Sequence, residues 1–204
     1  MRSLIEVYTL CELFVMENDP EALEWSIKAL ETNIENVSKW KFFVEYVFAV
    51  LVAGFKVATI NQRWNRIRDA LWGFNFVKIY MNSDLARKRL LRAFGNKRKA
   101  DAIIKGAIRI TDLDWDDFKK EIVKDINVLD DLPGIGPVSV YQIARNLGYD
   151  TIKPDRHIKR VADYFGLNPF EMCKTIAEAT HQPAHYVDTV FWVAGSRGKL
   201  SEWL

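Results

Sequence analysis

The sequence LPGIGPVSVYQIARNLGYDTIKPDRHIKRVADYFGL, residues 132–167, decides what fold and chemistry are expected of the whole chain. Pro133 and Gly134 break one helical pattern, and Gly136-Pro137 opens the next, which predicts a tight glycine turn between two helices. The first N–H groups of a helix have no partner inside the helix, and the helix dipole favours an anion there. We therefore expect the N–H groups of Ile135, Gly136 and Val138 to be free to bind a phosphate of a nucleic acid; the alternative is an ordinary helix connection.

Asp155 is the second feature of this stretch, because it stands twenty-one residues after Gly134 and directly before an amphipathic helical pattern. A fixed carboxylate can stabilise positive charge that develops on a sugar ring, and it can orient or deprotonate water. An aspartate at this place is also a good N-cap for the helix that follows. The two roles are compatible, and the residues leave both open.

LPGIG, the helix VSVYQIARNLG and the segment PDRHIKRVADYFGL together resemble the helix-hairpin-helix DNA glycosylase superfamily. Its pattern is LPGxG, a helix, and a short loop that ends in an aspartate two residues before a histidine or similar residue. The resemblance implies that Asp155 is the catalytic carboxylate, followed by His157, and that the hairpin grips the DNA backbone. The hairpin residues are Leu132, Pro133, Gly134, Ile135, Gly136 and Val138. The resemblance also implies a monovalent cation, K⁺ or Na⁺, at the backbone carbonyls of Asp130, Leu132 and Ile135.

Two departures from the family pattern narrow the expected chemistry. Some members carry a lysine as the seventh residue of the LPGxGxK string, where it attacks the sugar and gives strand cleavage, but this chain has Val138 there. The resemblance therefore implies a monofunctional enzyme without lyase activity, unless another lysine, such as Lys153, reaches the sugar. Cys11 and Cys173 are too few to ligate the iron–sulfur cluster of the endonuclease III branch, so no cofactor is expected to be required.

Helical periodicity runs through most of the chain, and no alternation of apolar and polar residues lasts long enough to indicate a strand. The sequence predicts an all-α, two-lobed glycosylase-like fold of roughly ten helices. These include helices over 37–55, 61–72, 84–94 and 99–110, of which the apolar 37–55 is expected to centre the core. Residues 1–204 are expected to form one unit, with a basic-faced lobe at 40–130, the hairpin and catalytic loop at 130–165, and a second lobe from 1–35 and 166–204.

The net charge of +2 is unevenly distributed along the chain. Residues 1–40 hold three basic and eight acidic side chains, whereas residues 54–110 hold fourteen basic and three acidic ones. Such a local excess suits salt-dependent binding to phosphates, although a lysine- and arginine-rich helix is often only a solvated face. The candidates for DNA-backbone contacts are Arg87, Lys88, Lys97, Arg98 and Lys99.

Four residues are candidates for the pocket that receives a flipped base: Phe55, Tyr141, Asp188 and Trp192. Phe55 follows Gly54, which stands where relatives have a glutamine, and an apolar side chain there could wedge between bases or belong to the core. Asp188 and Trp192 lie four residues apart, so they share one face of a helix and could read and stack on a base. The alternative is that Trp192 belongs to the core and Asp188 caps a helix or pairs with an arginine. Tyr141 faces either the pocket or the core.

The interpretation that unites these features is a DNA glycosylase of base excision repair, which flips and excises a modified or mispaired base from double-stranded DNA. Two alternatives are a glycosylase-fold transferase of phage-type base hypermodification and a non-catalytic helix-hairpin-helix DNA-binding module. The start of the chain contains Glu6 and Glu12 and does not resemble a signal peptide, and the apolar run 42–55 is too short to span a bilayer. We expect a monomer in the cytoplasm, associated with the nucleoid and not with a membrane.

Overall fold

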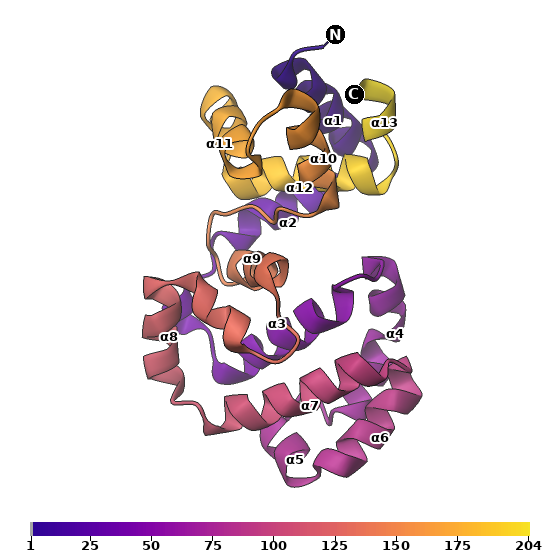
Figure 1. Ribbon diagram of the computed structural model, residues 1–204, viewed down its shortest axis with the longest axis vertical. Helices are drawn as coiled ribbons and strands as arrows, with labels where there is room; N and C mark the ends of the chain where they lie inside the picture. The colour runs from indigo at the N-terminus through magenta and orange to yellow at the C-terminus, as the bar shows by residue number, and fades with distance from the viewer. Residues whose placement is uncertain (1) are drawn as a thin grey trace. The chain divides into compact units, whose positions relative to one another are not determined.

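The computed structural model describes residues 2–204, and within them it contains helices and no strand (Figure 1). The predicted all-α fold class is therefore confirmed. The chain divides into two compact units, which we call the terminal unit (Met1–Asn33 with Ala144–Leu204) and the middle unit (Ile34–Ile143). The boundary falls inside α9 (Pro137–Asn146), between the hairpin and Asp155. None of the helices formed by residues 2–204 is long and apolar enough to cross a membrane.

The terminal unit is organised around α12 (Ala184–Ser196), whose neighbours come from both ends of the chain. Its neighbours are α1 (Leu4–Asn18), α2 (Pro20–Ala29), α10 (Arg156–Phe165), α11 (Pro169–Thr180) and α13 (Leu200–Trp203). Nine of the thirteen residues of α12 are buried, as expected for a helix surrounded by others. The buried set includes His185 and Asp188, so this core contains ionisable groups.

The middle unit is built on α3 (Lys39–Val52), the most apolar helix expected from the sequence. α3 contacts α4 (Val57–Ala70), α5 (Phe76–Met81), α7 (Lys97–Asp112) and α8 (Trp115–Lys124). α6 (Ser83–Phe94) packs on α4 and α7, and the 3₁₀ helices η1 (Ile34–Asn36) and η2 (Ile126–Asp131) pack on α8. The side chain of Ser38 caps α3 by accepting a hydrogen bond from the Lys41 N–H, and Gly54 with φ +76° follows its end. The helix 37–55 is therefore shorter than predicted at both ends.

Two further differences have local causes. α4 begins at Val57, four residues before the predicted start, because its N-cap Lys56 makes no side-chain capping bond and so gives no capping signal in the sequence. The structure also contains thirteen α-helices over residues 2–204, whereas the sequence predicted roughly ten. The short helices α5 and α13 account for part of this difference, since six and four residues are too few to show a helical period.

Close packing inside the middle unit brings α7 and the hairpin to the same side chain. A Cβ atom on Gly106 of α7 would lie 2.1 Å from the hydroxyl oxygen of Tyr46, so only glycine lets the tyrosine ring rest on this helix. The Tyr46 hydroxyl lies 2.8 Å from the carbonyl oxygen of Ala102 and 2.6 Å from that of Pro133. Burial raises the pKa of Tyr46, which therefore stays protonated as a hydrogen-bond donor.

Candidate functional site

The glycine turn lies between η2 and α9, and its shape is fixed by close contact with α7. Gly134 has φ +79°, and a Cβ atom there would lie 2.7 Å from the Cβ atom of Ala102. The Ile135 N–H donates to the Leu132 carbonyl at 3.1 Å, which closes the turn. Leu132 and Ile135 are buried, so their side chains anchor the hairpin while its backbone lies at the surface.

The turn leaves fewer amides available than the sequence predicts. The expectation that the Ile135 N–H is free is wrong, because this amide closes the turn. The N–H groups of Gly136 and Val138 find no hydrogen-bond acceptor among residues 2–204. They stand at the start of α9, where the helix dipole favours an anion. Two amides therefore remain for a phosphate.

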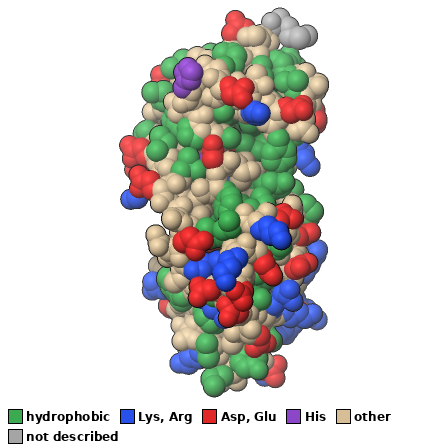
Figure 2. All heavy atoms as spheres, turned by 90° about the vertical axis from the view of Figure 1, so that its left-hand side faces the viewer, with side chains coloured by type: hydrophobic (Ala, Val, Ile, Leu, Met, Phe, Trp, Pro, Cys, Tyr) green, Lys and Arg blue, Asp and Glu red, His purple; other side chains and the backbone are tan. Residues whose placement is uncertain are grey.

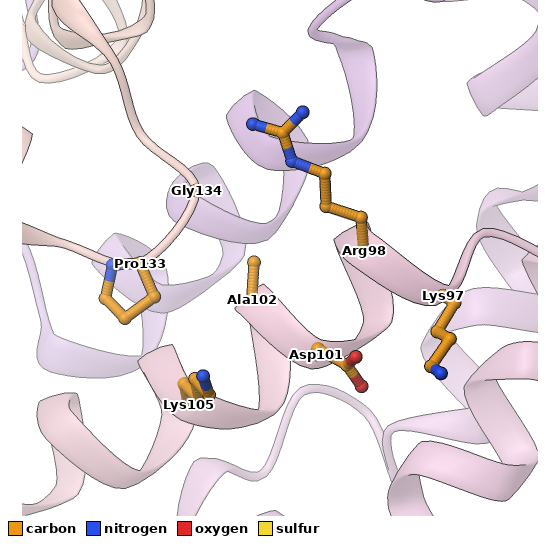
Figure 3. Close-up of a pocket in the computed structure, with 7 residues that line it drawn as sticks. All are labelled: Lys97, Arg98, Asp101, Ala102, Lys105, Pro133 and Gly134. Atoms are coloured by element: carbon orange, nitrogen blue, oxygen red, sulfur yellow. The ribbon is translucent and has the colours of Figure 1, made fainter.

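A hollow of about 570 Å³ lies beside the turn in the middle unit (Figure 3). Its lining comes from the first half of α7 and from the turn: Lys97, Arg98, Asp101, Ala102, Lys105, Pro133 and Gly134. Lys97 and Arg98 are exposed candidates from the sequence, whereas Lys105 was not anticipated. Its spacing of seven residues from Arg98 places both on one helix face and could have identified it. Three cationic side chains thus line a hollow that reaches the hairpin glycine.

Two of the five proposed backbone contacts are already engaged within the protein. The Lys99 ammonium donates to the carbonyls of Val50 and Ala53 at the end of α3, where unpaired carbonyls attract a cation. Burial lowers the pKa of Lys99 to about 8. Among the candidates for DNA-backbone contacts, Lys99 therefore has its ammonium engaged at a helix end within the protein. Arg87 is partly neutralised, since its Nε lies 2.5 Å from Oδ1 of Asp101.

Lys88 is exposed on α6. Another part of the middle unit's surface carries both positive and negative side chains. A second hollow, of about 550 Å³, lies on the α8 side and mixes basic with acidic residues: Arg109, Lys124, Glu121, Asp125 and Asp131. Figure 2 shows red and blue side chains interspersed on this face of the middle unit. A mixed surface attracts a polyanion less than the cationic hollow beside the turn does.

In the terminal unit, Asp155 is the N-cap of α10. Its Oδ1 accepts the His157 N–H at 2.8 Å and the Ile158 N–H at 3.4 Å. No hydrogen bond or ion pair to its Oδ2 is formed by residues 2–204, and the side chain is half-buried. Capping therefore occupies one oxygen of the carboxylate and leaves the other available for chemistry.

Two cationic side chains interact with the charge of Asp155. Arg145, at the end of α9, is buried, and burial lowers its pKa to about 10 while attraction to Asp155 opposes the shift. For Lys153, burial and repulsion from Arg145 lower the pKa, and attraction to Asp155 again opposes them. Burial likewise lowers the pKa of His157, whose ring lies against Gly195 of α12, so this imidazole is neutral at pH 7.

The four base-pocket candidates have distinct environments. Asp188 is buried and ion-paired with Arg145, as in the alternative that it pairs with an arginine. The prediction that Asp188 accepts a hydrogen bond from a base is wrong. Trp192 is half-buried against the core of the terminal unit. Phe55 is 40 % exposed, with its ring 5.3 Å from that of Phe94, and Tyr141 is half-buried on α9.

A comparison with solved structures finds the crystal structure of the 8-oxoguanine DNA glycosylase of Thermotoga maritima. The two structures superimpose with a TM-score of 0.70 over 93 % of this chain and 96 % of that one, at 19 % sequence identity. This likeness shows that the chain has the all-helical fold of that glycosylase. No family model matches the sequence, and no curated protein matches it significantly.

Proposed function

We propose that this protein is a DNA glycosylase that hydrolyses the N-glycosidic bond of a damaged or mispaired base in double-stranded DNA. The observation that carries the proposal is the state of Asp155, a half-buried carboxylate with one oxygen fixed by two backbone amides and the other unbonded within residues 2–204. A structural cap alone does not require the second oxygen to stay unpaired. A carboxylate that acts on a sugar does.

The chemistry follows from the charge that develops during the reaction. Departure of the base leaves positive charge on the deoxyribose, which the free oxygen of Asp155 stabilises while it orients the attacking water. The target base must leave the stack before any side chain can reach its glycosidic bond. The amides of Gly136 and Val138, with Lys97, Arg98 and Lys105, supply contacts to the DNA backbone.

The proposal includes a monofunctional reaction and a cation at the hairpin. Val138 has no amine with which to attack the sugar, so the product is an intact strand with an abasic site. The carbonyl of Asp130 receives no 3₁₀ bond from residue 133, since proline has no N–H. With the carbonyls of Leu132 and Ile135 it would give K⁺ or Na⁺ an all-oxygen donor set, and such an ion would bring positive charge to the turn.

The test is to incubate the protein with duplexes that contain uracil, a G·T mismatch, 8-oxoguanine or an alkylated purine, and to treat the products with alkali. We expect Asp155→Asn to lower the single-turnover rate about 10²- to 10⁴-fold, since loss of an acid–base or electrostatic group has effects of this size. The matched control is Asp163→Asn, which removes an exposed carboxylate from the same helix.

Each other outcome of this experiment would indicate a different function or a different role for Asp155. An unchanged rate in Asp155→Asn would refute the catalytic assignment. Strand breakage without alkali, trapped by borohydride and lost in Lys153→Met, would identify a lyase. A base that gains mass while its glycosidic bond stays intact would indicate a transferase, and salt-dependent binding without turnover on any lesion would indicate a binding module.

A further inference from the structure

The loop that carries Asp155, residues 147–155, is joined to α12 by two hydrogen bonds of opposite direction. Oδ1 of Asp150 in the loop accepts the His185 N–H of α12 at 2.9 Å. Oδ2 of Asp188 in α12 accepts the Lys153 N–H of the loop at 3.1 Å. Between these two points Ile152 is buried in the core that α12 organises. The Asp155 loop is therefore fixed to the central helix of its own unit along most of its length.

The connection from Asp188 to Asp155 is short. The Asp155 N–H donates to the Lys153 carbonyl at 2.6 Å, so the residue whose amide Asp188 binds also orients the backbone of Asp155. On the other side of Asp155, the His157 N–H of α10 donates to Oδ1 of the Asp155 carboxylate and holds that oxygen in place. The orientation of the free oxygen is thus set from both sides.

Asp188 is itself fixed by a buried arginine. The Arg145 guanidinium pairs with the same Oδ2 that accepts the Lys153 amide, and the two side chains are only 10 % and 2 % exposed. The Nε of Arg145 has no hydrogen-bond partner among residues 2–204. A buried ion pair often contributes less stability than apolar residues of the same volume, and an unpaired buried N–H adds a further cost. Stability alone gives no reason for charged residues at this place.

We propose that Asp188 and Arg145 are positioning residues, which hold the Asp155 loop in one conformation so that the carboxylate is oriented before DNA binds. The proposal rests on the proposed function, because it concerns the rate of the step that Asp155 performs. A group held in place in advance avoids reorganisation during the reaction, and a displacement of about 1 Å can lower a rate about 10²-fold. Asp188 and Arg145 act through the loop and do not touch the sugar.

Two substitutions at residue 188 separate the hydrogen bond from the charge. Asp188→Ala removes the acceptor of the Lys153 amide, whereas Asp188→Asn keeps an acceptor oxygen and removes only the charge. We expect the single-turnover rate to fall about 10²-fold in Asp188→Ala and clearly less in Asp188→Asn, with the affinity for an abasic-site duplex unchanged in both. Asp163→Asn again serves as the control.

Single-turnover kinetics distinguish positioning from a loss of folded protein. When substrate exceeds enzyme, fewer folded molecules lower the amplitude of the first turnover, whereas a displaced carboxylate lowers its rate constant. A lower amplitude with an unchanged rate constant would overturn the proposal. So would equal rate constants in Asp188→Ala and the wild type.

Hydrogen–deuterium exchange tests the same contact without any activity. We expect the amides of residues 147–158 to exchange faster in Asp188→Ala than in the wild type or in Asp163→Asn. Unchanged exchange would overturn the proposal whatever the activity. A wild-type protein inactive on every lesion would instead refute the proposed function, and the exchange data would still decide whether Asp188 holds the loop.

Discussion

The hairpin and the Asp155 loop are both irregular segments that precede a helix, yet they are fixed by different interactions. The hairpin of the middle unit is fixed by shape, through the close approach of Gly134 to Ala102 and the Tyr46 hydroxyl between α7 and Pro133. The Asp155 loop of the terminal unit is fixed by hydrogen bonds to α12, one of which ends on Asp188, a carboxylate that is itself ion-paired with Arg145.

The hairpin and the Asp155 loop are held by different interactions because they offer different groups to a ligand. A hairpin that offers backbone amides needs only a rigid backbone, which close packing supplies without burying any charge. A loop that offers a carboxylate must hold a charged group in a defined direction, and buried charges and hydrogen bonds provide direction at the expense of desolvation. The two segments should therefore respond differently to the removal of charge, the addition of volume and a change of pH.

The largest effect is expected from removing one partner of the buried pair. Arg145→Met or Asp188→Leu alone should lower the free energy of unfolding by about 3–5 kcal/mol, because each leaves an uncompensated buried charge. The double variant should lose clearly less than the sum, although the Lys153 N–H still lacks its acceptor. Urea unfolding provides the measurement, and Lys174→Met, at an exposed pair 3.9 Å from Glu178, should change it by less than about 0.5 kcal/mol. Additive losses would show that Arg145 and Asp188 do not stabilise the fold as a pair.

A smaller effect is expected from adding one methyl group to the hairpin. Gly134→Ala should cost about 2–4 kcal/mol, because a left-handed φ and a contact of 2.7 Å with Ala102 act together. Gly198→Ala is the matched control, since Gly198 has nearly the same φ, +81°, and no atom within 4 Å of the added Cβ. It should cost only about 1–2 kcal/mol. Equal losses in thermal unfolding would mean that strain and not close packing defines the turn.

The smallest effect concerns the pH dependence of stability. Burial, assisted by Arg145, lowers the pKa of His185 from 6.5 to about 3, and both ring nitrogens lack partners among residues 2–204. Between these values the unfolded chain binds a proton that the folded chain does not, so stability falls as the pH falls from 6.5 toward 3. From pH 7 to pH 5 the loss should be about 2 kcal/mol.

His185→Phe keeps an aromatic ring beside Trp25 and should lack this part of the pH dependence. Denaturant unfolding at the two pH values measures it. His181→Asn, at an exposed position with φ +55° that asparagine accepts, should behave like the wild type. An equal slope in His185→Phe would assign the acid sensitivity to other groups.

Features that depend on neighbours within a few residues were predictable from the amino-acid sequence. The helical class followed from periodicity, the turn at Gly134 from its need for a positive φ, and the capping position of Asp155 from its place before α10. α11 likewise begins at a local cap, since the Asn168 side chain accepts the N–H groups of Phe170 and Glu171. Such features are local because a helix and its caps bond residues at most four apart.

Which charges are free depends on contacts between residues that are far apart in the chain. Lys99 reaches the end of α3, 46 residues earlier, and Arg145 pairs with Asp188, 43 residues later, so neither partner is visible in a local pattern. Lys97 and Arg98 have the same charge and similar spacing but stay exposed. The sequence gives the number of charges and their positions along the chain. Folding brings distant groups together, and that proximity determines whether a charged side chain caps a helix, holds a loop or faces a ligand.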